Sequence, residues 1–231
     1  MREDSQENGA DRYSSPAASS SSTGNVKATK EDWLKLALET LISDGVDGVR
    51  ILTLGQKLGI SRSSFYWYFK SRQDLLDQLL QYWRERNTRG ILAQSVLPAT
   101  SVTQGVLNIF ECWYDEDLFN PRLDFAVRAW ANGSTDVRKI VDLADRERVD
   151  AIYSMFLRCG CPKADALIRA RILYFTQIGY YALEIVESIE NRLTHLPTYL
   201  RIHAGRDPLD GEIKAFVARA LRRVADKRPV P

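Results

Sequence analysis

Between Arg62 and Trp67 the chain carries side chains that can bind a nucleic acid. Phe65 and Phe69 are four residues apart, so on a helix they face the same way, and we expect that way to be inward. An outward arginine can pair with guanine, and outward aromatic groups can donate to a phosphate or lie against a thymine methyl. The spacing leaves a polar and aromatic set on the outer face: Arg62, Ser63, Tyr66 and Trp67.

Tyr66 and Trp67 have a second interpretation, as aromatic residues of the core. Phe65 and Phe69 already fill the inward positions of the same helix, so exposure is favoured.

A shorter helix must precede this one and hold it in place. Ile51, Leu54 and Leu58 share one helix face, and Gly59 follows where a helix stop is expected. Ser61 is then in position to cap the second helix through its side chain. Two short helices joined by a tight glycine turn indicate a helix-turn-helix.

Charge is concentrated around the same segment. From Val46 to Arg72 there are five basic residues and one acidic residue, a local charge of +5 − 1 = +4, whereas the whole chain carries +2. Such a local excess of positive charge favours the binding of a polyanion such as DNA.

Three segments together resemble the TetR family of bacterial transcriptional regulators. They are 58–61 (Leu-Gly-Ile-Ser), 65–69 (Phe-Tyr-Trp-Tyr-Phe) and 71–76 (Ser-Arg-Gln-Asp-Leu-Leu). The likeness covers about 30–76, and the remainder carries no family-wide motif. It implies a dimeric DNA-binding protein whose C-terminal helices sense a small molecule.

The resemblance also implies roles for single residues. Tyr66 and Tyr68 match phosphate-binding positions, Arg72 matches a phosphate-binding lysine, and Arg62, Ser63 and Trp67 match positions against base edges. The DNA-binding residues that we predict are Arg50, Thr53, Arg62, Ser63, Ser64, Tyr66, Trp67, Tyr68, Lys70 and Arg72.

The helix before the turn departs from the family pattern. Arg50 stands where a capping threonine is usual, Leu52 where an arginine is usual, and Gly55 where alanine is usual. Phosphate contacts from this helix are therefore left to Arg50 or Thr53.

Composition restricts the class of protein. The chain has 231 residues, 45% apolar and 27% charged, as in an ordinary soluble protein of one large or two small domains. No apolar signal core or membrane span is recognisable, and three cysteines suit a reducing compartment, so we expect a cytoplasmic protein with no membrane partner.

No chemistry of an enzyme is recognisable. There is no nucleophile–base set or phosphate loop, and only His195 and His203 offer imidazole. Cys159 and Cys161 are read as a turn that holds two thiols rather than a metal site. We expect no catalytic residues, no cofactor and no metal.

Helical periodicity throughout predicts an all-α, TetR-like fold. We expect a disordered tail at 1–26, a three-helix DNA-binding domain at 27–75, and a helical ligand-binding and dimerisation domain at 76–231. The face of one helix formed by Arg146, Glu147, Arg148 and Asp150 is expected to be solvated. The expected helices cover about 29–43, 51–58, 61–69, 71–93, 101–114, 121–132, 134–158, 162–189 and 210–224.

Two of these helices are candidates for a homodimer interface. The helix at about 163–189 is apolar nearly all round, and 210–224 has a continuous apolar stripe. Two helices from each of two chains would form a four-helix bundle, as the resemblance also implies. The alternative is a monomer in which the two helices cover each other.

Aromatic residues gather on the helices between 101 and 189, with Arg128 and Gln177 among them. They form either a plain core with Arg128 reaching outward, or a cavity with polar anchors. The resemblance favours a cavity, in which Arg128 would meet an anionic group. The predicted ligand residues are Phe110, Trp113, Arg128, Trp130, Tyr174, Gln177 and Tyr181.

The sequence therefore predicts a repressor that binds a palindromic double-stranded DNA operator as a homodimer and is released by an unknown small-molecule effector. The helix at 71–93 would transmit the ligand's effect to the DNA-binding domains. The alternative is a DNA-binding regulator or nucleoid-organising protein without an effector, whose interior would be filled by its own side chains.

Overall fold

The computed structural model describes residues 28–227, which fold into helices and turns with no strand among them. The predicted tail at 1–26 lies outside the described residues. The elements are α1 (Lys30–Asp44), η1 (Val46–Gly48), α2 (Ile51–Leu58), α3 (Arg62–Phe65), α4 (Arg72–Trp83), η2 (Arg84–Thr88), α5 (Arg89–Ser95), α6 (Val102–Tyr114), α7 (Pro121–Asn132), α8 (Thr135–Arg158), α9 (Lys163–Ala182), α10 (Ile189–Ala204) and α11 (Asp210–Lys227).

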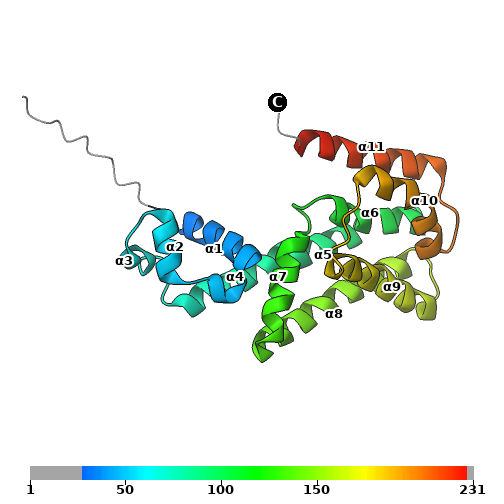
Figure 1. Cartoon of the computed structure of the whole chain (residues 1–231). Coiled ribbons are helices and arrows are strands. Elements are labelled where there is room, and N and C mark those ends of the chain that lie inside the picture. The colour runs from blue at the N-terminus through cyan, green and yellow to red at the C-terminus, as the bar shows by residue number, and fades with distance from the viewer. Residues whose placement is uncertain (1–27, 228–231) are drawn as a thin grey trace, which may run out of the picture.

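The molecule is elongated, with α1–α4 at one end and α6 and α9–α11 at the other (Figure 1). Helices α7 and α8 occupy the middle, where α7 contacts both α1 and α4. The path from α4 through η2 to α5 leads from the first end to the second, so it joins the two halves. In the described chain no helix is long and apolar enough to cross a membrane.

Helix α1 begins at a capping box formed by Thr29 and Asp32, and ends at Gly45, whose φ of 73° suits glycine. Its buried side is centred on Trp33, Ala37 and Leu41. Leu34 and Leu38 of the same helix are only half-buried.

The single helix expected at 71–93 is a helical path from Arg72 to Ser95 with a π-helical segment, η2, in its middle. Ser71 caps its start by accepting from the Asp74 N–H. The wider turn of η2 places Asn87 and Thr88 in the protein interior. Just beyond it, Gly90 passes so close to the Leu118 carbonyl that a Cβ would lie 1.9 Å from its oxygen.

The predicted starts of the next three helices are confirmed. Ser101, Asn120 and Ser134 cap α6, α7 and α8, and Pro121 is the first residue of α7. Ser101 and Gln104 have the spacing of a capping box, but the box is incomplete, because the Gln104 amide donates to the Asn108 side chain.

The long helix expected at about 162–189 is shorter. Helix α9 ends at Ala182, and a loop at 183–188 leads to α10, which Ser188 caps. Glu184 in this loop has a φ of 50°, which is unusual for a residue with a side chain. Periodicity did not reveal the break, since apolar residues continue through Leu183, Ile185 and Val186.

Helix α11 packs against α6 and α10 of its own chain. Phe216 and Ala220 are buried in one core cluster with α6 and α10, and Arg219 pairs with Glu111 of α6 at 2.9 Å. The stripe that we offered to a partner at 210–224 is thus used largely within the monomer. The alternative pairing of α9 with α11 is also wrong for this stripe, because it rests on α6 and α10.

The described core forms two clusters. One joins α1–α4 to α7 and the first half of α8, and the other lies among α5, α6 and the helices from the second half of α8 to α11. Leu123, Val127 and Trp130 of α7 therefore pack with the helix-turn-helix. A displacement of α7 will therefore move the helices of the helix-turn-helix, because closely packed interiors transmit displacement.

Candidate nucleic-acid interface

The turn between α2 and α3 is built as the sequence predicts. Gly59 adopts the left-handed conformation, with φ 68°, and its N–H donates to the Gln56 carbonyl at 3.1 Å. The Ile60 N–H donates to the Gly55 carbonyl at 3.0 Å, which closes the end of α2. This fixes the direction in which α3 leaves.

Aromatic packing fixes the rotation of α3. Phe65 and Phe69 are 0% and 2% exposed, with ring centroids 5.0 Å apart, and Trp33 of α1 packs edge-on against Phe65 at 5.2 Å. The prediction that these phenylalanines point inward is confirmed. With both rings anchored, the opposite side of the segment must face solvent.

That opposite side, which we call the reading face, is exposed as predicted. Tyr66 is 48% exposed and Trp67 is 68% exposed. An Arg62 guanidinium nitrogen lies 3.1 Å from the Tyr66 hydroxyl, and the same guanidinium lies over the Tyr66 ring at 5.8 Å. This pairing holds the Arg62 side chain in one direction. The reading face consists of Arg62, Ser63, Tyr66 and Trp67.

The start of α3 differs from expectation. Ser61 occupies the N-cap position but makes no side-chain cap; its hydroxyl lies 2.8 Å from the Ser63 hydroxyl. Ser64 donates from its hydroxyl to the Ser61 carbonyl at 2.7 Å. Helix α3 itself is only Arg62–Phe65, and a turn continues to Tyr68. The helix predicted at 61–69 was therefore too long.

The remaining basic and polar residues lie beside the reading face or near it in sequence. Arg50 is exposed at the N-cap of α2, where its Nε donates to the Asp47 carbonyl at 2.8 Å. Thr53 is half-buried on α2, and Lys70 is exposed before α4. Nothing in these positions prevents a phosphate from reaching Arg50 or Lys70.

Two predicted phosphate ligands are bound inside the protein instead. The Arg72 guanidinium donates to the carbonyls of Val49 at 2.6 Å and Val46 at 2.5 Å. The Tyr68 hydroxyl donates to the Ala28 carbonyl at 3.1 Å. We correct the assignment of Arg72 from phosphate binding to positioning, because its fork holds the turn before α2 against α4.

The predicted ligand residues are not brought together in one cavity. Phe110, Trp113 and Gln177 line a cavity of about 50 Å³ between α6, α9 and α10. Trp130 and Tyr181 line a groove of about 800 Å³ between α7, the 183–186 loop and the end of α1. Arg128 and Tyr174 belong to a third feature, a set of ion pairs.

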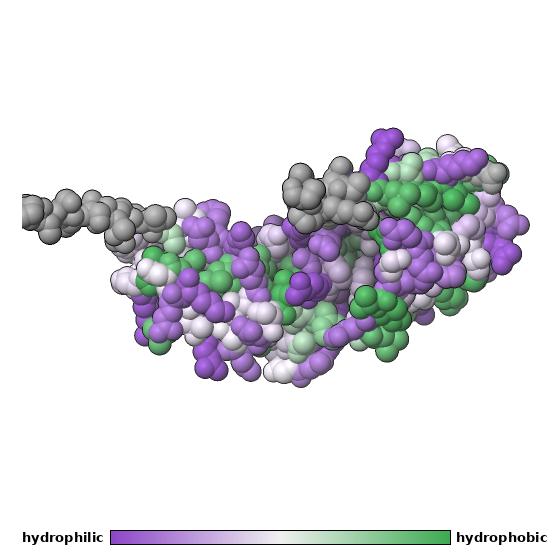
Figure 2. Space-filling model, turned by 45° about the horizontal axis from the view of Figure 1, so that its top comes forward, coloured by the Kyte–Doolittle hydropathy of each residue, from purple (hydrophilic) through white to green (hydrophobic). Residues whose placement is uncertain are grey.

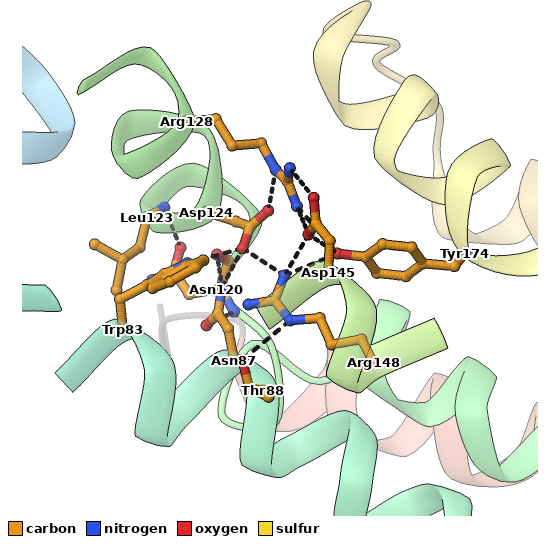
Figure 3. A network of polar contacts seen from close by, with 10 residues as sticks. All are labelled: Trp83, Asn87, Thr88, Asn120, Leu123, Asp124, Arg128, Asp145, Arg148 and Tyr174. Carbon is orange, nitrogen blue, oxygen red and sulfur yellow. Dashed lines mark hydrogen bonds and ion pairs between the residues drawn. The ribbon is translucent and has the colours of Figure 1, made fainter. Parts of the chain in front are cut away.

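This third feature, which we call the polar junction, ties five elements together (Figure 3). Arg128 donates to Asp124 at 2.8 Å and to both oxygens of Asp145 at 2.6 and 2.9 Å. Arg148 donates to Asp124 at 3.0 Å, and the Tyr174 hydroxyl donates to Asp145 at 2.6 Å. Arg128 therefore does not reach outward, as the plain-core interpretation expected, but pairs with two carboxylates of its own chain. Its contact with an anionic effector stays a prediction.

The polar junction also holds the end of α4. The Trp83 indole donates to Asp124 at 2.8 Å, and Asn87 of η2 donates to the Asn120 carbonyl at 2.9 Å. The Arg148 Nε donates to the Thr88 hydroxyl at 3.1 Å. The π-helical turn is thus the segment whose side chains meet α7 and α8.

Arg148 contradicts the expectation of a solvated face. Its side chain is 0% exposed, and its guanidinium lies 4.9 Å from the Trp83 ring and 5.5 Å from the Phe119 ring. A signal for this was present, because Arg148 follows Val141 and Ala144 on the buried stripe of α8 and precedes Ile152. Its position on this stripe, and not its charge, decides where the side chain lies.

Electrostatics keep the polar junction ionised. Burial acts to raise the pKa of Asp124, but Arg148 and Arg128 hold it below its usual value. Burial acts to lower the pKa of Arg148, but Asp124 raises it above its usual value. Two carboxylates and two guanidinium groups balance, so removal of one leaves an uncompensated buried charge.

The described region was also compared with the expectations for metal-binding and thiol groups. Residues 28–227 contain no group of three or more His, Cys, Asp or Glu side chains that could hold a metal ion. Cys112 is buried, and burial raises the pKa of its thiol.

Comparison with known proteins places the likeness at the N-terminal end. A sequence profile described as "Bacterial regulatory proteins, tetR family" matches residues 34–79. The tetracycline repressor protein class D of Escherichia coli is 40% identical over 53 residues, 23% of this chain and 24% of the repressor. The class C protein of Escherichia coli is 34% identical over 55 residues, 24% of this chain and 25% of the repressor. The match spans about a quarter of these relatives' length.

Solved structures resemble the chain over more of its length. Salmonella enterica GusR has a TM-score of 0.58 at 17% identity, covering 78% of this chain and 99% of that one. A tetR-family transcriptional regulator from Streptomyces coelicolor has a TM-score of 0.50 at 20% identity, covering 84% and 88%. At such identities the likeness concerns the helical fold alone.

Proposed function

The chain belongs to the TetR family through its N-terminal domain, and on that premise we propose that it is a transcriptional repressor. In this proposal the protein binds a palindromic DNA operator as a homodimer in the cytoplasm, and a small molecule bound in its C-terminal half releases it. The proposal of repression follows the tetracycline repressors, whose likeness is confined to the DNA-binding segment.

The observation that carries the proposal is the orientation of the reading face. Buried Phe65 and Phe69 turn Arg62 and Trp67 to solvent, where base edges of a major groove can reach them. We propose that Arg62, Ser63 and Trp67 lie against base edges. Phosphates on either side are proposed to meet Arg50, Thr53, Ser64, Tyr66 and Lys70.

An exposed apolar face supports the homodimer. On α9, Ile168 and Phe175 are 51% and 54% exposed, and Ile172 lies between them on the same face. Figure 2 shows large hydrophobic patches on the C-terminal half of the visible surface. We therefore propose dimerisation through α9 and the adjoining α10, rather than through the buried side of α11. Ile172→Glu should give a monomer in light scattering, and exposed Arg171→Glu should not.

Release by an effector requires a path from the C-terminal half to the reading face. Helix α4 begins beside the helix-turn-helix and ends at Trp83, which is bonded to Asp124 of the polar junction. We propose that a ligand changes the arrangement of α6–α9, that the polar junction shifts α4, and that the two reading faces of the dimer lose the spacing of the operator. Half-sites one helical turn apart, about 34–36 Å, tolerate little displacement.

The experiment that tests the proposal selects bound duplexes from random DNA with the purified chain, then screens small molecules for loss of the complex. A palindromic consensus bound by the wild type and weakened by Arg62→Ala supports it. If no duplex is enriched at low salt, the DNA-binding proposal is wrong. If a duplex is enriched but no molecule releases it, the alternative regulator without an effector is favoured.

A further inference from the structure

The cavity between α6, α9 and α10 differs from an ordinary gap in a core by the groups that line it. Half of its lining residues carry rings: Phe110, Trp113, Tyr114, Tyr180, Tyr199 and His203. Phe110 meets the His203 ring edge-on at 5.9 Å, and Tyr199 stacks on the His203 ring at 6.3 Å. Walls of this kind accept a flat, unsaturated molecule.

Three residues that line the cavity each carry a buried polar atom without a hydrogen-bond partner. The atoms are Trp113 Nε1, Gln177 Nε2 and His203 Nδ1, on side chains 7%, 9% and 5% exposed. The Gln177 amide also approaches the Tyr181 phenol, but without the geometry of a hydrogen bond. The Trp113 indole can only donate, so the group that satisfies it must be an acceptor.

Such atoms are rare in a folded protein. Leaving a buried polar group unpaired destabilises the folded state, and here three such groups from different helices belong to residues that line one cavity. Trp113 is on α6, Gln177 on α9 and His203 on α10. Their convergence indicates a shared ligand rather than three independent defects.

A cation completes the lining. Arg192 of α10 has Tyr114 and Tyr180 rings 5.0 and 4.9 Å from its guanidinium carbon. Within the described residues its guanidinium makes no ion pair and donates no hydrogen bond, while its backbone N–H donates to the Ser188 carbonyl at 3.0 Å. Nearby Glu187 accepts from the Tyr180 hydroxyl at 2.5 Å and from the Asn191 amide. The Arg192 fork therefore remains available to a carboxylate.

We propose that this cavity binds a small aromatic carboxylate, whose oxygens accept from Arg192 and from the Trp113 N–H while its ring lies among the aromatic walls. The Gln177 amide and the His203 imidazole bond to the ligand's remaining polar group. This inference rests on the proposed function, because it names the class of effector for the C-terminal half.

The size of the cavity sets a limit on the ligand. Its volume of about 50 Å³ is well below the roughly 300–1,000 Å³ of sites for drug-sized molecules. A ring therefore has to displace part of the wall, and the Tyr180–Glu187 side is formed by the end of α9 and the 183–188 loop. The opposite side of this loop lines the groove against α1, so the displacement is directed towards the DNA-binding domain.

The test measures binding of benzoate, the smallest member of the class, to the full chain by calorimetry without DNA. Benzamide is the matched probe, since it keeps the ring and an acceptor but lacks the charge. Arg192→Gln and Trp113→Phe remove the fork and the N–H, and Arg201→Gln is an exposed control on the same helix. Thermal unfolding of each variant checks that it folds.

We expect saturable benzoate binding that Arg192→Gln weakens at least about 10-fold and Trp113→Phe about 5-fold, with Arg201→Gln unchanged. Benzamide should bind more weakly than benzoate and respond to Trp113→Phe only. No saturable binding up to roughly 20 mM, or equal loss in all three variants, overturns the inference. Wild-type binding to a selected operator is scored separately, so failure of the ligand and failure of the repressor are distinguishable.

Discussion

The reading face and the polar junction are both made of charged and aromatic side chains, yet they obey different rules. The reading face lies outside, and its residues are set by four-residue spacing within one short segment. The polar junction lies inside, and its members come from elements far apart in sequence. The comparison teaches that charged and aromatic side chains face solvent or form the internal framework according to what packs beneath them.

Removing the buried guanidinium should have the largest effect. Arg148→Met leaves Asp124 without one of its two cations and leaves Tyr174 with altered partners. We expect the free energy of unfolding to fall by roughly 3–5 kcal/mol in urea titrations. Arg146→Met, at an exposed position on the same helix, should change it by less than about 0.5 kcal/mol.

A double variant sharpens this result. Asp124→Asn with Arg148→Met removes both charges, and should recover part of the lost stability if the loss comes from an uncompensated charge. Equal stability of Arg148→Met and the wild type would mean that the polar junction is not a framework.

The two histidines of α10 allow an exposed and a buried side chain of the same type to be compared within one helix, because His203 is buried and His195 is exposed. Burial, with a smaller contribution from Arg169, lowers the pKa of His203 from 6.5 to about 4. The unfolded chain therefore binds a proton below pH 6.5 that the folded chain binds only near 4. Stability should fall as pH decreases through this window, by roughly 2–3 kcal/mol between pH 7.5 and 4.5.

Denaturant titrations across this pH range test the effect of His203. The loss should be smaller in His203→Gln and unchanged in His195→Gln. Phe110, Tyr199 and Arg169 surround His203, and none of them is expected to change charge between pH 4.5 and 7.5. A wild type whose stability is constant over this range would contradict the buried neutral imidazole.

Arg72 and Lys70 lie two residues apart, yet the first is bonded within the protein and the second is exposed. Arg72→Lys loses the fork that holds the Val46 and Val49 carbonyls, so stability should fall by about 1–2 kcal/mol. The salt dependence of DNA binding should be unchanged, because Arg72 is assigned to positioning. Lys70→Gln, at an exposed position, should leave the free energy of unfolding unchanged. It should lower the slope of the logarithm of the DNA-binding constant against the logarithm of the salt concentration by about one.

The sequence predicted the reading face because its determinants are local. Phe65, Phe69 and Gly59 are close together, and helical geometry alone fixes their relation. Arg148 was misassigned because its partners Asp124 and Thr88 lie 24 and 60 positions away, and only the packed fold brings them near. Arg72 was misassigned for the same reason, since its acceptors are main-chain carbonyls that carry no side-chain signal.

The loss of helix at 183–188 and the scattering of the predicted ligand residues also depend on tertiary packing. Apolar residues continue through the break, so composition could not locate it. Phe110, Trp113 and Gln177 line one cavity, whereas Arg128 forms ion pairs with Asp124 and Asp145. Which polar residue anchors a ligand is decided by which one the fold leaves unpaired.

The most direct test compares the base preferences of the wild type and Arg62→Ala on every single substitution of a selected operator. We predict that the wild type discriminates at one position of each half-site by about 1–3 kcal/mol, and that the variant loses this preference alone. Its thermal stability should be unchanged, because Arg62 is exposed. A variant with the same base preferences as the wild type would contradict the assignment of the reading face.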